Sequence, residues 1–170
     1  MKISVPVKSG HLPDIYGKYA PESEKLNGAP VRSFPITIED APEETVTYAI
    51  TVLDHDAIPV GGFTWIHWVA ANIDGNLTEI PDNASQSGAI AMTLGKNSTA
   101  GSLVGNTDPQ TNQHYVGPQP PDRDHRYTVT VYAIDEKLPL FDGFWLNQMM
   151  DAMHDHILAK ASTIVMSRAK

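Results

Sequence analysis

Apolar and polar residues alternate along two stretches of the chain. From residue 45 to 53, β-branched side chains dominate and every second position is apolar, as in a strand with one buried face. The alternating positions there are Val46, Tyr48, Ile50 and Val52. Residues 126–134 repeat this pattern, whereas residues 65–73 are apolar almost throughout, as in a strand buried on both faces. The sequence therefore predicts three strands.

A helical pattern occurs only in the last third of the chain. Apolar residues recur there at steps of three and four, with polar residues between them, which predicts an amphipathic helix over residues 146–161 that lies against the sheet. The apolar positions are Leu146, Met149, Met150, Met153, Ile157 and Ala161. Because parallel strands would need helices between them, strands followed by one late helix favour an antiparallel, mainly β domain with peripheral short helices. Residues 95–112 are expected to be irregular surface chain.

Composition narrows the class of protein. The 170 residues fit one domain over 1–170, and 41% hydrophobic with 19% charged residues is typical of a globular chain. No stretch is long enough to cross a membrane, and the N-terminus lacks a signal-peptide pattern, so we expect a soluble, cytoplasmic protein. The absence of cysteine excludes disulfides and thiol catalysis.

A net charge of −8 sets limits on the partners. Such a charge repels nucleic-acid backbones and anionic membrane surfaces at long range, so we expect no nucleic-acid binding. A pocket for a single phosphate is still compatible with it, because short-range donors outweigh a screened global field.

Candidate functional residues lie where apolar strands begin or end. Asp54 and Asp56 directly follow the first strand, and in extended geometry a spacing of two places both side chains on one side; the alternative is a surface turn in which they cap backbone amides. His67 lies within an apolar strand and needs a hydrogen-bond partner there, which a satisfied core histidine would also have. His125 and Tyr127 share one face of the third strand, either as site residues or as an ordinary strand start.

The segment from Gly117 to Pro121 contains three prolines and has few backbone donors. It therefore suits a stiff pocket wall, with room for a cis X-Pro bond, better than a loop that cradles phosphate. Together the candidates supply two carboxylates, two imidazoles and a phenol. Imidazolium and phenol donors suit a phosphate and a carboxylate suits an ammonium group, so the set matches a zwitterionic phosphoester.

Three motifs in this order resemble the phosphatidylethanolamine-binding protein family, which includes the Raf kinase inhibitor proteins, and in particular its bacterial and archaeal branch. Residues 54–59 (Asp-His-Asp-Ala-Ile-Pro) resemble its Asp-Pro-Asp-Ala-Pro signature. Residues 65–69 with Asn72 resemble its Trp-His-aromatic strand, and residues 115–127 resemble its Gly-x-x-Pro-Pro and His-Arg-Tyr block. Residues 132–135 and 156–159 match more weakly, the latter to a helical His-Val-Leu-Ala sequence.

The resemblance implies a β-sandwich with short helices and a pocket for an anion. Carried over by position, the pocket residues are Asp54, Asp56, His67, Gly117, Pro118, Pro121, His125 and Tyr127. The resemblance also implies regulation of a protein partner, in the manner of a Raf kinase inhibitor-like protein, and a homodimer. We expect no cofactor.

The chain departs from the family pattern in two places. His55 and Ile58 replace both prolines of the first motif, which leaves the aim of the two aspartates open. The tail from Thr163 to Lys170 lacks the Gly-x-Tyr-x-Arg ending that follows the bacterial helix, so no tail residue is assigned to the ligand.

The leading hypothesis is noncatalytic binding of a small phosphate-bearing ligand, because no nucleophile and base form an evident pair. One alternative is a hydrolase or lyase that uses His67 or His125 beside Asp54 or Asp56. A second is an iron or zinc site of two histidines and carboxylates, although no helical His-x-x-x-His pair supports it. A third is a purely structural or protein-interaction role.

Overall fold

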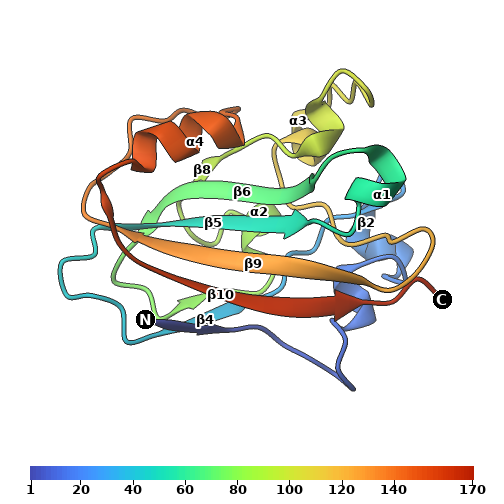
Figure 1. Ribbon diagram of the computed structural model, residues 1–170, viewed down its shortest axis with the longest axis horizontal. Coiled ribbons are helices and arrows are strands. Elements are labelled where there is room, and N and C mark those ends of the chain that lie inside the picture. The colour runs from blue at the N-terminus through green and yellow to red at the C-terminus, as the bar shows by residue number, and fades with distance from the viewer.

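A five-stranded antiparallel sheet forms the centre of the molecule. A computed structural model describes residues 1–170 and orders this sheet β10-β9-β5-β6-β8 (Figure 1). The three predicted strands are confirmed as its central members. The strands are β5 (Thr47–Asp54), β6 (Trp65–Asp74), β8 (Thr93–Leu94), β9 (His125–Ile134) and β10 (Ile157–Ser167).

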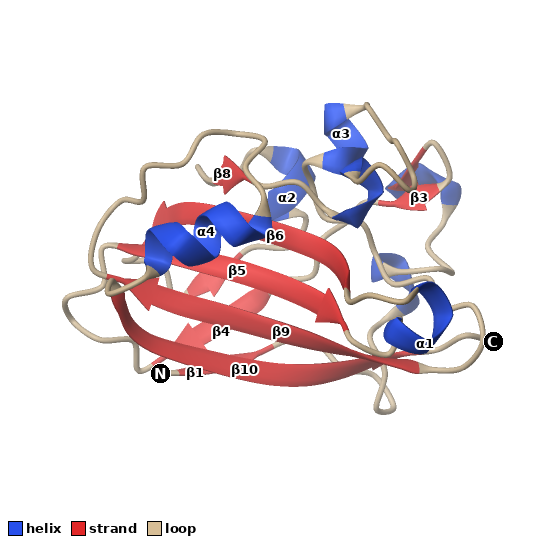
Figure 2. Cartoon of the chain, turned by 45° about the horizontal axis from the view of Figure 1, so that its top comes forward, coloured by secondary structure: helices blue, strands red, loops and turns tan.

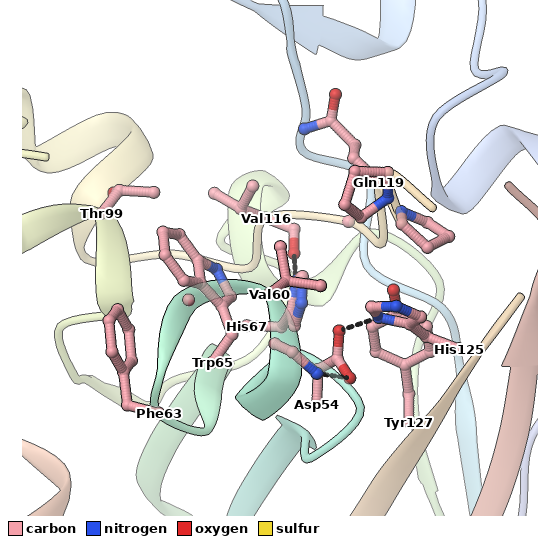
Figure 3. Close-up of a pocket in the computed structure, with 15 residues that line it drawn as sticks. Asp54, Val60, Phe63, Trp65, His67, Thr99, Val116, Gln119, His125 and Tyr127 are labelled. Atoms are coloured by element: carbon pink, nitrogen blue, oxygen red, sulfur yellow. Dashed lines mark hydrogen bonds and ion pairs between the residues drawn. The ribbon is translucent and has the colours of Figure 1, made fainter. Parts of the chain in front are cut away.

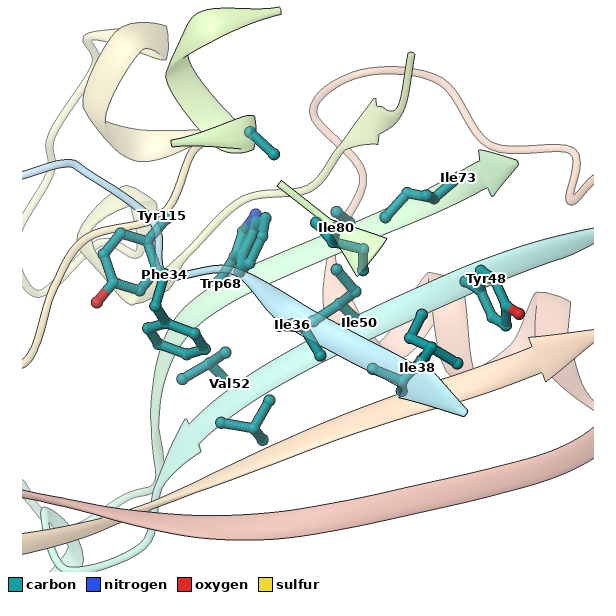
Figure 4. Packing of buried hydrophobic residues seen from close by; sticks show 14 of the residues in the cluster. Phe34, Ile36, Ile38, Tyr48, Ile50, Val52, Trp68, Ile73, Ile80 and Tyr115 are labelled. Carbon is teal, nitrogen blue, oxygen red and sulfur yellow. The ribbon is translucent and has the colours of Figure 1, made fainter. Parts of the chain in front are cut away.

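A smaller sheet covers one face of the large one and makes the fold a sandwich, as expected. Its strands are β4 (Ile36–Glu39) between β1 (Lys2–Ser4) and β7 (Glu79–Ile80), all antiparallel. Side chains from both sheets fill the space between them (Figure 4). Fully buried residues of this core include Phe34, Ile36, Tyr48, Ile50, Val52, Trp68, Val129 and Val131. A two-stranded hairpin, β2 (Lys25–Leu26) and β3 (Ala29–Pro30), lies outside both sheets.

On the opposite face of the large sheet, α4 (Leu146–Met153) packs on the part formed by β5 and β6, as Figure 2 shows. Met149 and Met153 of this helix pack with Val69 and Ala71 of β6 in a second apolar cluster. Because Trp68 and Ala70 of the same strand face the main core, β6 is buried on both sides. This explains why its sequence is apolar almost throughout.

The predicted helix over residues 146–161 is correct only as far as Met153. The backbone leaves helical geometry at His154 (φ −57, ψ 130), and Asp155 adopts a positive φ of 66°. Ile157 and Ala161 instead belong to β10, which pairs with β9 along its length. The period of two in Ala159, Ala161, Thr163 and Val165 suits this strand, and pairing with a central strand outweighs the coincidental helical spacing.

Short helices occupy the periphery, and residues 95–112 are largely irregular, as expected. That segment is nevertheless fixed: Nδ2 of Asn97 donates to the carbonyl oxygens of Thr111 (2.7 Å) and His114 (2.8 Å). All peptide bonds are trans, so the cis X-Pro bond is not present. None of the helices combines the length and the apolar composition that a membrane span requires. The short helices are η1 (Asp14–Tyr16), η2 (Glu22–Glu24), α1 (Ile58–Gly61), α2 (Ala84–Ser87), η3 (Ser98–Ala100) and α3 (Pro109–Asn112).

Candidate functional site

Strand register brings the candidate residues to one end of the large sheet. Asp54, the last residue of β5, pairs with Trp65 at the start of β6 and with Tyr127 near the start of β9. His67 follows Trp65 by two positions and His125 precedes Tyr127 by two, so alternation along each strand returns their side chains to the same face. The prediction that His125 and Tyr127 share one face of their strand is therefore confirmed.

These side chains meet in a cavity of about 270 Å³ (Figure 3). This volume is small for a drug-like ligand and suits a small ion or a head group. Six of the eight predicted residues line the cavity, whereas Asp56 and Pro118 do not. The lining residues are Asp54, Ala57, Val60, Gly61, Phe63, Trp65, His67, Thr99, Val116, Gly117, Gln119, Pro120, Pro121, His125 and Tyr127.

His125 is held between two carboxylates. Its Nδ1 lies 2.7 Å from Oδ2 of Asp54, and its Nε2 lies 2.9 Å from Oδ1 of Asp122. Burial alone lowers the pKa of the ring, but hydrogen bonds and charge attraction from the two aspartates outweigh it, so the pKa is raised above 6.5. Since ionised carboxylates only accept, both ring nitrogens donate, and His125 is an imidazolium.

His67 is in the opposite protonation state. Its Nδ1 donates to the carbonyl oxygen of Val116 over 2.7 Å, which leaves Nε2 as the free nitrogen of the ring. Burial lowers the pKa of His67 below 6.5, against the opposing effects of that hydrogen bond and of Asp54. A neutral ring that donates from Nδ1 carries a lone pair on Nε2. One candidate histidine is thus a cation and the other a neutral acceptor.

Tyr127 and Asp54 complete the polar part of the cavity. The Tyr127 ring packs edge-on against His67 with ring centroids 5.1 Å apart, and burial followed by the charge of Asp54 raises the pKa of its phenol well above its usual range. The phenol therefore keeps its proton. Oδ1 of Asp54 accepts from the backbone N–H of Ala57 over 3.1 Å, which fixes the carboxylate.

Asp56 does not line the cavity, so the prediction that extended geometry places both aspartate side chains on one side of the site is wrong. The chain turns directly after Asp54 to enter α1, and extended geometry does not persist. Asp56 instead accepts from the backbone N–H (2.9 Å) and the side chain of Arg126, and pairs with Arg123. These bonds hold the pKa of Asp56 well below its usual range. Asp56 thus ties this turn to the start of β9. The turn-capping alternative that spacing left open describes Asp54 instead, whose Oδ1 accepts from the N–H of Ala57.

Gly117 fixes the wall opposite α1. Its N–H donates to the carbonyl oxygen of Pro30 over 2.8 Å, and a Cβ atom there would collide with the carbonyl oxygen of Tyr16. Pro118 is buried behind the wall, where its carbonyl oxygen accepts from the N–H of Lys18. The stiff wall predicted from three prolines is thus present, although Pro118 supports it from outside the cavity.

The sequence did not single out the apolar rim of the cavity. Phe63 and Trp65 stack with centroids 5.9 Å apart, and Val60 of α1 is exposed beside them. Trp65 could have been found, because it shares the strand face of His67. Thr99 carried no such signal, since it comes from an irregular segment. The chain holds no group of three or more His, Asp or Glu side chains arranged to bind a metal ion.

A family model extends this picture from the site to the whole chain. The model for phosphatidylethanolamine-binding proteins matches residues 3–168. The chain belongs to the phosphatidylethanolamine-binding protein family. Family membership supports a function as a binding protein.

Relatives of this family member occur in bacteria and archaea. YxkA of Bacillus subtilis is 49% identical over 158 residues, which is 93% of this chain and 94% of the relative. A UPF0098 protein of Chlamydia muridarum is 34% identical over 86% of this chain and 88% of its own length. The crystal structure of the family homologue CT736 from Chlamydia trachomatis shares the fold, with a TM-score of 0.78 at 24% identity over 99% of this chain and 97% of the other.

The two departures from the family pattern have clear positions in this phosphatidylethanolamine-binding protein. Ile58 begins α1, and Nδ1 of His55 lies 3.0 Å from Oγ1 of Thr64 across the turn. The tail ends beside η1, where Arg168 pairs with Asp14 over 2.8 Å. No residue of the tail lines the cavity.

Proposed function

We propose that this protein is a noncatalytic binding protein for a small phosphate-bearing ligand with a head group like phosphoethanolamine. The observation that carries this proposal is the convergence of His67, His125, Tyr127 and Asp54 in one cavity of head-group size. An imidazolium and a phenol can donate to phosphate oxygens, and Asp54 can accept from an ammonium group.

His67 has a specific part in this binding mode. Its unprotonated Nε2 repels an ionised phosphate oxygen. Binding therefore requires either that Nε2 becomes protonated or that a protonated phosphate oxygen donates a hydrogen bond to it. A bound phosphate would favour the charged ring and raise the pKa of His67. Exposed apolar side chains at the rim, Val60 and Phe63, suit the carbon portion of a phosphoester.

Calorimetric titration with phosphoethanolamine, inorganic phosphate and ethanolamine tests this function. We expect His125→Gln to weaken phosphoethanolamine binding by about tenfold or more, because it removes a charged donor. His154→Gln is the matched control, since His154 is 80% exposed and outside the cavity. If the wild type binds none of the three ligands at millimolar concentration, or if both variants bind equally well, the proposed function is wrong.

The short contact between Asp54 and His125 favours a hydrolase or lyase as the second candidate, because a carboxylate can orient a histidine base. Two observations weaken it. Nε2 of His125 is already bonded to Asp122, and the only hydroxyl groups that line the cavity belong to Thr99 and Tyr127. Turnover in an ester and phosphoester screen that His125→Ala abolishes would replace noncatalytic binding with this function.

We further propose that the protein acts in the cytoplasm as a homodimer, and that ligand binding regulates a protein partner, as the resemblance to Raf kinase inhibitor-like proteins implies. Light scattering coupled to size-exclusion chromatography tests the dimer, and a monomeric mass would contradict it. Affinity capture with the wild type and His125→Gln tests the regulation, which requires a partner whose binding differs between the two.

A further inference from the structure

Every hydrogen-bond donor of His125 is already in use. Nδ1 is bonded to Asp54 and Nε2 to Asp122, and the ring is only 1% exposed. An anionic ligand can therefore receive a hydrogen bond from this imidazolium only if one of the two aspartates leaves. The two aspartates differ in how firmly they are held.

Asp54 is not free to leave. Its side chain is 5% exposed, and its second oxygen accepts from the N–H of Ala57. Displacing it would bury an unpaired carboxylate, which is costly. Asp122 is the opposite case, because its side chain is 51% exposed and would be hydrated on release.

Asp122 also has a second partner within reach. Nε of Arg123 lies 3.9 Å from its other oxygen, Oδ2. The residue comes directly after Pro120 and Pro121, which line the cavity, so a movement of Asp122 takes place at the cavity wall. The carboxylate can thus exchange His125 for solvent and Arg123 without leaving a buried group unpaired.

We propose that Asp122 is a displaceable internal counter-ion that sets the anion affinity of the cavity. In this structure, Oδ1 of Asp122 accepts a hydrogen bond from Nε2 of His125. When phosphate binds, a phosphate oxygen replaces Oδ1 as the acceptor, and the side chain of Asp122 turns to solvent. This inference rests on the proposed function. Asp122 does not line the cavity, yet it controls the phosphate affinity, because the ligand has to compete with it for Nε2 of His125.

Inorganic phosphate is the probe, and Asp122→Ala is the decisive variant. At constant pH and ionic strength, we expect its phosphate dissociation constant to fall by about tenfold, because one charge-assisted hydrogen bond no longer competes. Asp122→Asn keeps a weaker acceptor on His125 and should lie between the variant and the wild type. Asp124→Ala is the matched control, because the Asp124 side chain accepts from His11 and from the N–H of Ala169, whereas the His125 ring is bonded to Asp54 and Asp122.

The outcomes separate the two claims. Tighter phosphate binding by Asp122→Ala alone supports the inference, also when the wild type binds too weakly to measure. Equal tightening by Asp124→Ala shows a general charge effect and overturns it. If the wild type and Asp122→Ala bind phosphate equally, the inference fails and the proposed function stands. If neither binds inorganic phosphate, the inference fails, and the titration with phosphoethanolamine decides the proposed function separately.

Discussion

Two neighbouring histidines with opposite protonation states define the site at the scale of single residues. His125 donates from both nitrogens to aspartates, whereas buried His67 bonds a backbone carbonyl oxygen and stays neutral. Neither state follows from the sequence, because it depends on which acceptor each ring meets after folding. The local partners, rather than the residue type, set the charge of the cavity.

NMR titration of the histidine rings tests this assignment. We expect His125 to titrate above 6.5, the ordinary pKa of histidine, and His67 below it. Asp122→Ala should lower the pKa of His125 by removing one of its two acceptors. Titration of both rings at the ordinary value would contradict the assignment.

The same two pKa shifts have opposite effects on stability. The depressed pKa of His67 contributes stability that is present above pH 6.5 and is lost as the pH falls through its folded pKa. The raised pKa of His125 contributes stability that is present below pH 6.5 and is lost as the pH rises through its folded pKa. In urea unfolding across this range, His67→Gln should lose less stability on the acid side than the wild type. An unchanged acid-side slope would argue against a neutral His67.

Asp56 has a structural part, through its bonds to Arg126, whereas Asp54 lines the cavity. We expect Asp56→Asn to destabilise the fold by about 1–2 kcal/mol, because its bonds to the backbone and guanidinium of Arg126 are weakened. Its effect on phosphoethanolamine binding should be small, since the side chain does not line the cavity. Urea unfolding and calorimetry measure the two effects. Lost binding with unchanged stability would return Asp56 to the site.

At the scale of elements, α4 is held by its buried methionine face. Met149 is fully buried whereas Met150 is 60% exposed, so neighbouring positions give a matched pair. We expect Met149→Ala to cost about 2–5 kcal/mol through loss of burial and a cavity, and Met150→Ala to be nearly neutral. Chemical unfolding of both variants measures this, and similar losses would contradict the packing of α4 on the sheet.

Gly117 gives a second matched pair, at the cavity wall. Gly117→Ala places a methyl group against the carbonyl oxygen of Tyr16, whereas Gly61→Ala meets no atom closer than 3.8 Å. We expect a clear drop in melting temperature for the first and little change for the second. If Gly117→Ala is as stable as the wild type, the wall is not fixed by this contact.

The sequence was sufficient to predict those strands whose hydrophobic pattern matches the faces that are buried in the fold. Strands β5, β6 and β9 were predictable because alternation or continuous apolarity reports which faces are covered. Strand β10 was not, because Leu146 to Ala161 fits a helical spacing by coincidence and only pairing with β9 distinguishes the two. Within the site, the alternation of side chains along a strand was enough to predict that His125 and Tyr127 share one face. The direction of Asp56 depended on a turn that no periodicity encodes.

At the scale of the whole molecule, a net charge of −8 surrounds a cavity proposed to bind an anion. Long-range attraction cannot bring such a ligand in, so affinity has to come from short-range donors that are already oriented. The sandwich provides this orientation, because three strand ends bring Asp54, His67, His125 and Tyr127 together from separate parts of the chain. Binding should therefore depend more on these side chains than on ionic strength.

Ring-nitrogen NMR of the wild type during titration with phosphoethanolamine tests the central claim most directly. We predict saturable shifts of His67 and His125, with Nε2 of His67 gaining a proton as the phosphate binds, while exposed His154 does not respond. Unchanged resonances of both cavity histidines at millimolar ligand, in protein that is demonstrably folded, would contradict the claim.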